Sequence, residues 1–137
     1  MLSLKSLEGR GVGPYREHVS QDRISAFCTA VGARVDTQAP PTFFTVFRKG
    51  EFELFKELGI ELARVLHAEQ EYHLEGRVRA GDEVEFETTL VHVFEKQSKL
   101  GQMHFLTFET RFLVERELIM QSIGTAKTTI VVRDRKE

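Results

Sequence analysis

Residues 39–82 read APPTFFTVFRKGEFELFKELGIELARVLHAEQEYHLEGRVRAGD, and this stretch decides the fold. Its first part, residues 42–59, places apolar side chains on most sides of a helix, and a helix of that kind belongs inside a protein. Pro40 and Pro41 come just before it, and proline is tolerated at the first position of a helix. We therefore predict a buried helix over residues 42–59, interrupted near Gly50.

After this helix the sequence predicts β-strands. Residues 65–74 alternate between two faces, and three longer strand candidates follow at 83–97, 102–115 and 118–133, joined by short turns. Strands this long must bend, and Gly124 is the expected place. The alternation in residues 65–74 puts one set on the inner face, namely Leu66, Ala68, Gln70, Tyr72 and Leu74, and a second set on the outer face, namely His67, Glu69, Glu71 and His73.

The N-terminal part adds a short strand and a helix. Residues 1–13 have little periodicity, and residues 14–19 fit an edge strand. Ser20 is a suitable N-cap for an amphipathic helix that ends at Gly32. One buried helix followed by strands in hairpin succession predicts an α+β domain of the hot-dog type, in which a curled antiparallel sheet wraps a central apolar helix. We expect a single domain over residues 1–137.

The amino-acid composition indicates which partners are not favoured and where the protein is expected to reside. The net charge of -2 mixes 19 basic and 21 acidic residues without a basic block, so nothing favours nucleic acid or an anionic membrane surface. Cys28 is the one cysteine, and no apolar run reaches membrane-spanning length, so we expect a cytoplasmic protein. The 11 phenylalanines, with no tryptophan, suit a tight core or a dry slot.

Four pieces of the sequence together resemble a known family. They are Ala39-Pro40-Pro41-Thr42, Leu58-Gly59-Ile60, the LHAEQEY of residues 66–72 and Ala80-Gly81-Asp82. The chain from about Gly13 to Arg133 looks like the N-terminal-type domain of MaoC-like dehydratases, also called the FAS1-like dehydratase domain. The resemblance implies a hot-dog fold, dimers joined at their sheet edges, and reversible hydration of a 2-enoyl thioester to a 3-hydroxyacyl thioester. It implies no cofactor beyond the coenzyme A or acyl carrier protein that carries the substrate.

The loop before the buried helix departs from the family pattern. Catalytic members carry an Asp and a His there, separated by a few residues that include Asn-Pro, whereas residues 32–40 contain Asp36 and no histidine. One interpretation is a subunit that works with a catalytic hot-dog partner. The alternatives are a stand-alone hydratase that uses Asp36 and His67, a thioesterase, or a non-catalytic module that binds acyl thioesters. Both a homodimer and a heterodimer remain open.

The candidate binding residues each have a structural alternative. Thr42 could stabilise an oxyanion at the helix start or cap that helix. Gln70 is the polar residue on an apolar face, so it either ties down a loop or faces the thioester carbonyl. Phe43 and Phe44 belong to the core and could also line an acyl slot. The His and Glu residues of 67–73 lie along a strand and do not converge, so we expect no metal site.

Overall fold

The computed structural model describes residues 4–99 and 101–133. Its five strands form one antiparallel sheet in the order β1-β3-β4-β5-β2. The elements in chain order are the 3-10 helix η1 (Leu4–Leu7), β1 (Gly11–His18), α1 (Gln21–Val31), the 3-10 helix η2 (Pro41–Val46), α2 (Lys49–Leu58), the 3-10 helix η3 (Leu62–Arg64), β2 (Val65–Leu74), β3 (Glu83–Ser98), β4 (Gly101–Arg116) and β5 (Ile119–Arg133).

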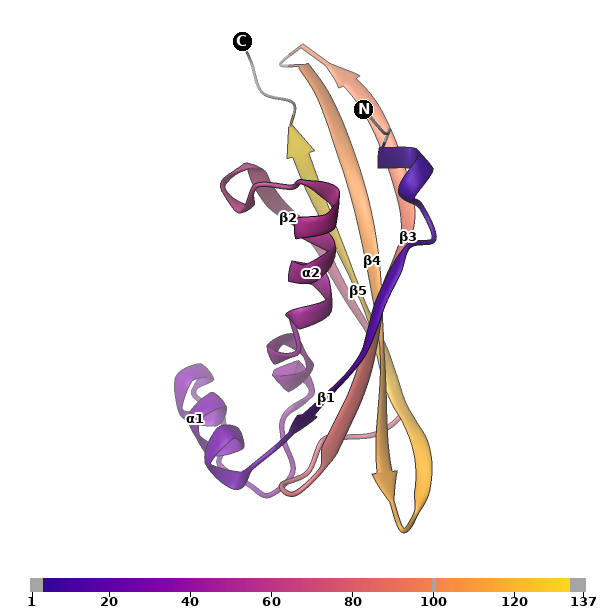
Figure 1. Cartoon of the computed structure of the whole chain (residues 1–137). Helices are drawn as coiled ribbons and strands as arrows, with labels where there is room; N and C mark the ends of the chain where they lie inside the picture. Colours follow the sequence, from indigo (N-terminus) through magenta and orange to yellow (C-terminus); the bar gives the residue numbers. More distant parts are fainter. Residues whose placement is uncertain (1–3, 100, 134–137) are drawn as a thin grey trace.

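The helices α1 and α2 and the 3-10 helix η2 lie along one face of the long, twisted sheet (Figure 1). The core between them has two clusters. Phenylalanines dominate the first, where Phe47 packs against Phe86 and Phe112. The second joins Leu54 and Phe55 of α2 to the other end of the sheet. This arrangement confirms the predicted α+β hot-dog fold, and apolar burial supplies most of its stability.

The predicted helix over residues 42–59 is two elements. The chain forms η2, leaves the helical conformation at Phe47 (φ -89°, ψ 72°) and starts α2 at Lys49. The predicted interruption near Gly50 is confirmed, and it falls just before this residue, at Phe47 and Arg48. Gly50 lies inside α2, where a Cβ would meet the Cβ of Thr88 at 2.6 Å. The glycine lets α2 approach β3 closely, and the break falls where Phe47 turns into the core.

The strand and helix boundaries largely follow the sequence. Strand β1 begins at Gly11, earlier than the predicted residue 14. Ser20 caps α1 by accepting a hydrogen bond from the backbone N–H of Arg23 (3.1 Å), and Gly32 ends this helix with a φ of 74°. Gly124 adopts a φ of 144° at a register shift between β4 and β5, which is the bend predicted for this residue.

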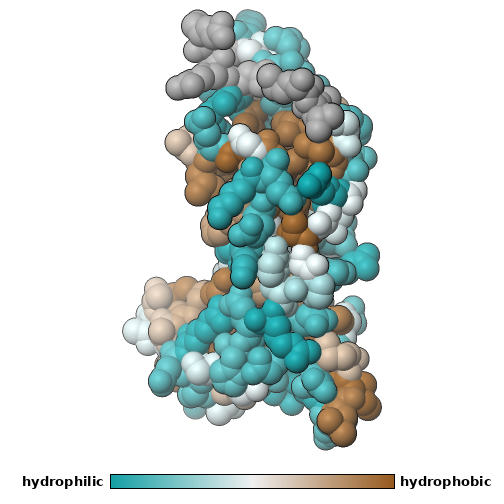
Figure 2. All heavy atoms as spheres, viewed as in Figure 1, coloured by the Kyte–Doolittle hydropathy of each residue, from teal (hydrophilic) through white to brown (hydrophobic). Residues whose placement is uncertain are grey.

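The β4–β5 hairpin ends in an exposed apolar tip. Figure 2 shows this tip as a brown cluster at the lower right. Its members are Leu118, Ile119 and Met120, and Leu118 is 93% exposed. Among the described residues, no helix is both long enough and apolar enough to cross a bilayer.

Candidate functional site

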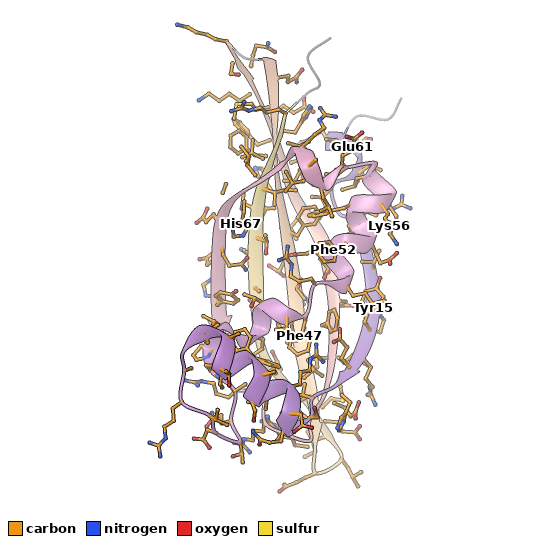
Figure 3. The ribbon with its side chains drawn as sticks, turned by 90° about the vertical axis from the view of Figure 1, so that its left-hand side faces the viewer. Tyr15, Phe47, Phe52, Lys56, Glu61 and His67 are labelled. Carbon is orange, nitrogen blue, oxygen red and sulfur yellow. The ribbon has the colours of Figure 1, made fainter. Side chains whose placement is uncertain are left out.

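A groove lies on the inner face of the sheet, between β2 and the segment formed by η2 and α2. Two adjoining hollows form it, and both are lined by Thr45, Arg48 and Gln70. Figure 3 looks into the groove, with His67 of β2 on one side, Phe52 of α2 on the other and β5 between them. The larger hollow has a volume of about 280 Å³. Its walls are mainly apolar, with Phe52, Phe55, Leu62, Val65 and Ile130.

The second hollow is tight and more polar. Its volume is about 20 Å³, and its polar lining beyond the shared residues consists of Glu51, Tyr72, Thr110 and Thr128. The groove therefore has an apolar end, near the C-terminus of α2, and a polar end, near the start of α2. A ligand with a polar head and an apolar chain matches this gradient.

A further hollow of about 460 Å³ lies on the opposite, outer face of the sheet. Outward side chains of both charges line it, among them Glu87, Glu109 and Arg111. We place the candidate site in the inner groove because three of the residues singled out from the sequence, His67, Gln70 and Phe44, line that groove and not the outer hollow.

A β-bulge decides which side chains of β2 enter the groove. His67 pairs with Ile130 and Glu69 pairs with Thr129, so Ala68 is the extra residue. The bulge moves Val65 and His67 to the inner face, where both line the groove, and leaves Leu66 55% exposed. The prediction that His67 lies on the face opposite Gln70, with Leu66 on the inner face, was therefore wrong. Beyond the bulge the predicted alternation holds, and Glu71 and His73 form an exposed pair at 3.0 Å.

Gln70 is held at the centre of the groove by three hydrogen bonds. Its amide nitrogen donates to the carbonyl oxygen of Lys127 (3.2 Å). Its amide oxygen accepts from the hydroxyl of Thr128 (2.9 Å) and lies 3.2 Å from the Nε2 of His67. The structure thus brings the predicted candidates His67 and Gln70 together. A side chain fixed in this way can present a polar group to a ligand without losing further conformational freedom.

Glu51 and Tyr72 lie at the polar end of the groove. Glu51 is only 5% exposed, and its carboxylate accepts a hydrogen bond from the Nε of Arg48. The Tyr72 hydroxyl is buried and has no hydrogen-bond partner among the described residues. Burial raises the pKa of Tyr72 above its ordinary value, and the negative charge of Glu51 raises it further, while Arg48 acts in the opposite direction. A neutral hydroxyl is therefore available there as a donor.

The start of α2 lies at the same polar end, because Arg48 and Glu51 flank its first turn. The N-terminal N–H groups of a helix favour a partial negative charge nearby. The sequence had pointed to Thr42 for this role. Thr42 is exposed and lies in the 3-10 helix turn, where its carbonyl oxygen accepts a hydrogen bond from the Thr45 hydroxyl (2.7 Å). The helix start beside the groove is thus at Lys49.

Of the other predicted residues, Phe44 lines the groove, whereas Asp36 and Phe43 do not. Asp36 is exposed, and its carboxylate accepts a hydrogen bond from the backbone N–H of Thr37 (2.7 Å), which is turn chemistry. Phe43 is fully buried, with its ring edge-on to Phe27. Phe44 is buried against Phe112, and both rings line the polar end. Asp36 is not brought together with His67 or Gln70.

Sequence reasoning missed Thr45, Arg48 and Glu51, which line the groove. One signal was available: a charged pair three residues apart, Arg48 and Glu51, in a segment predicted to be buried on most sides. Over residues 4–99 and 101–133, no three His, Cys, Asp or Glu side chains are placed to hold a metal ion.

The sequence matches a known family over most of its length. The family described as the FAS1-like, dehydratase domain region matches residues 6–122. The chain belongs to this family. The resemblance inferred from the motifs is thereby confirmed. A UPF0336 protein from Saccharopolyspora erythraea is 33% identical to this FAS1-like dehydratase domain over 106 residues, which are 74% of the chain and 63% of that relative. The match therefore spans less than two thirds of the relative.

Solved structures share the fold of this FAS1-like dehydratase domain. A chain of the HadBC (3R-hydroxyacyl-ACP dehydratase) complex from Mycobacterium tuberculosis superposes with a TM-score of 0.73 at 17% identity, covering 91% of this chain and 96% of that one. A chain of the ChsH1-ChsH2 complex from the same organism superposes with a TM-score of 0.68 at 20% identity, covering 95% of this chain and 91% of that one. A MaoC-like dehydratase from Rhodospirillum rubrum superposes with a TM-score of 0.67 at 19% identity, covering 100% of both chains. At these identities the likeness establishes the fold.

Proposed function

We propose that this chain binds the acyl part of a 2-enoyl or 3-hydroxyacyl thioester in the inner groove, as one subunit of a hydratase. The observation that carries the proposal is the gradient of the groove, from the apolar walls around Val65 and Ile130 to the polar end around Gln70 and Tyr72. An acyl chain would occupy the apolar end, and the thioester would lie at the polar end. Coenzyme A or an acyl carrier protein would carry the substrate.

In the reaction proposed, water adds across the double bond beside the thioester carbonyl, or leaves in reverse. One group must move the proton of the water, and donors must stabilise the enolate oxygen. The Tyr72 hydroxyl, which lines the polar end, and the amide N–H groups at the start of α2 are candidate donors. Asp36 lies in its own turn and is not a suitable base.

We propose that a second hot-dog subunit supplies the acid and base. Two observations support this. The loop of residues 32–40 has no histidine. Strand β2, which forms one wall of the groove, is an edge strand with β5 as its neighbour, so another strand can join there. Two structural neighbours of the chain belong to complexes, HadBC and ChsH1-ChsH2.

The test is hydration of enoyl thioesters by the purified chain, by a candidate hot-dog subunit, and by their mixture, followed through loss of the conjugated double bond. The proposal predicts activity in the mixture and none in the chain alone. A stable homodimer that is fully active by itself would contradict it.

Two neighbouring residues give a matched pair for the groove. Val65 faces the groove and Leu66 faces outward. Val65→Phe should shift the preference of the mixture toward shorter acyl chains, because the larger ring narrows the apolar end. Leu66→Phe should leave the preference unchanged. Equal effects of the two variants would argue against acyl binding in this groove.

One observation favours the stand-alone hydratase as a second candidate: the bulge at Ala68 places His67 inside the groove, beside Gln70. In that case the purified chain hydrates enoyl thioesters by itself. His67→Ala would abolish the activity, and His73→Ala, on the outer face of the same strand, would not. Activity that survives His67→Ala would exclude this candidate.

A further inference from the structure

The unpaired edge of β2 restricts which strand can pair with it. In the sheet described, β2 pairs with β5 on one side, and its other side offers main-chain N–H and C=O groups to a further strand. The proposed function places the partner subunit at this edge, and the inference below rests on it. The question is whether the edge suits a second copy of the chain or a different polypeptide.

The outer side chains at the middle of β2 are acidic. Strand β2 runs from Val65 to Leu74, so its midpoint lies between Glu69 and Gln70. Gln70 faces the groove, which leaves Glu69 and Glu71 on the outer face, and both are exposed. Within the sheet Glu69 lies opposite Thr129, and Glu71 lies opposite Lys127.

Two-fold symmetry restricts how two copies of β2 can pair. Directly opposite residues of an antiparallel pair point to the same face, so a symmetric pairing is centred on one residue that faces its own copy. Centred on Gln70, Glu69 of each copy faces Glu71 of the other. Centred on Glu69 or on Glu71, that glutamate faces itself. Every register near the midpoint therefore sets glutamate against glutamate, and like charges directly opposite are destabilising.

We propose that Glu69 and Glu71 make the β2 edge disfavour a second copy of the chain and favour a different chain. The chemistry of that partner follows: its antiparallel edge strand presents lysine or arginine opposite Glu69 and Glu71. Opposite charges across an antiparallel pair are stabilising, and they act only in the correct register. The free strand edge marks the docking site, and the two glutamates select the occupant.

The experiment measures self-association of the full chain by analytical ultracentrifugation. Glu69→Lys turns both Glu69–Glu71 contacts of the pairing centred on Gln70 into lysine–glutamate contacts. We expect the dimer dissociation constant to fall by at least about fourfold, from two cross-strand pairs that change from repulsive to attractive. Adding Glu71→Gln to this variant should remove the attractive part of the gain and leave only the relief of repulsion, because the lysine introduced at position 69 then faces a neutral side chain. Its dimer dissociation constant should lie between those of the unaltered chain and of Glu69→Lys. Glu115→Lys, an exposed site at the far end of β4, makes the same charge change and should leave self-association as it was.

The salt dependence of self-association is an independent test. Screening weakens repulsion between exposed charges, so added salt should strengthen self-association of the unaltered chain and weaken that of the Glu69→Lys variant. The inference is overturned if Glu69→Lys does not tighten the dimer, including the case in which every form stays monomeric. It is also overturned if Glu115→Lys tightens the dimer equally. No thioester or partner enters this experiment, so its failure leaves the activity test of the proposed function intact.

Discussion

Replacement of Gly50 by alanine tests how closely α2 must approach the sheet. In most helices a glycine-to-alanine change stabilises, by about 1 kcal/mol, because alanine has the higher helix propensity. At Gly50 the added Cβ would lie 2.1 Å from the hydroxyl oxygen of Thr88 and 2.6 Å from its Cβ. Ordinary contacts begin at 3.4 Å, so α2 would have to move away from β3 by about 0.8 Å to relieve the contact with the Thr88 Cβ, and by about 1.3 Å to relieve the contact with the hydroxyl oxygen.

Rotation of the Thr88 side chain does not relieve this contact. The Thr88 hydroxyl is hydrogen-bonded to the Thr110 hydroxyl at 2.8 Å, and both residues are buried. Rotation would break that bond, at a cost of about 1–3 kcal/mol, and would leave the Cβ contact unchanged. Overpacking of this kind costs about 1–3 kcal/mol. Because the added Cβ would make two contacts shorter than 3.0 Å, the cost lies in the upper part of this range, at about 2–3 kcal/mol. After the gain of about 1 kcal/mol in helix propensity, we predict that Gly50→Ala lowers the free energy of unfolding by about 1–2 kcal/mol.

Urea unfolding followed by circular dichroism measures this change. Lys56→Ala, an exposed substitution in the same helix, is the control and should change the free energy of unfolding by less than about 0.5 kcal/mol. In a Thr88→Ala background Gly50→Ala should cost less, because the hydroxyl oxygen is gone while the Cβ contact persists. A Gly50→Ala protein as stable as the original, or more stable, would refute the close approach of α2 to β3.

The remaining predictions concern single sites. Leu118 holds a φ of 65° in the β4–β5 turn, so Leu118→Gly should raise the free energy of unfolding by about 1 kcal/mol, and no gain in urea unfolding would contradict that strain. Asp82 accepts a hydrogen bond from Arg116 Nη2 (2.7 Å), and Asp82→Ala should cost about 2–3 kcal/mol in the same assay, whereas a neutral result would mean that the pair contributes little. Tyr72→Phe should leave stability within about 0.5 kcal/mol, because its hydroxyl has no partner among the described residues, and should weaken thioester binding by the assembled enzyme if the hydroxyl contacts the substrate. Burial raises the pKa of both Tyr15 and Tyr72 above the ordinary value of 10.0. The free energy of unfolding should therefore fall as the pH rises above 10 through the raised pKa values, and the tyrosine contribution should be complete below pH 10. A free energy of unfolding that rises above pH 10 would contradict this prediction.

The sequence predicts the fold well where a local pattern has a single physical meaning. Ser20 and Gly32 bound α1 because a side-chain cap and a left-handed residue act within one turn. Gly124 bends β5 where a Cβ would meet the carbonyl oxygen of His73 at 2.6 Å. The exact position of the break within residues 41–58 was not predictable in the same way, because the turn at Phe47 depends on rings contributed by β3 and β4.

The candidate site was harder to predict for a related reason. Simple alternation assigns His67 to the outer face, and nothing local marks Ala68 as a bulge. The bulge is a property of the pairing between β2 and β5, and one extra residue reverses the face of every side chain before it. Gln70 was identified because a lone amide on an apolar face must find partners, and its partners include Thr128, 58 residues later in the chain.

The position of the acyl chain in the assembled enzyme tests the central claim most directly. A non-hydrolysable acyl thioester with a photoreactive group at the end of its chain can be crosslinked to the complex, and the labelled residue identified by peptide mass spectrometry. We predict labelling of Phe52, Phe55 or Val65, at the apolar end of the groove. Labelling confined to the partner subunit, or to the outer face of this chain, would contradict the account.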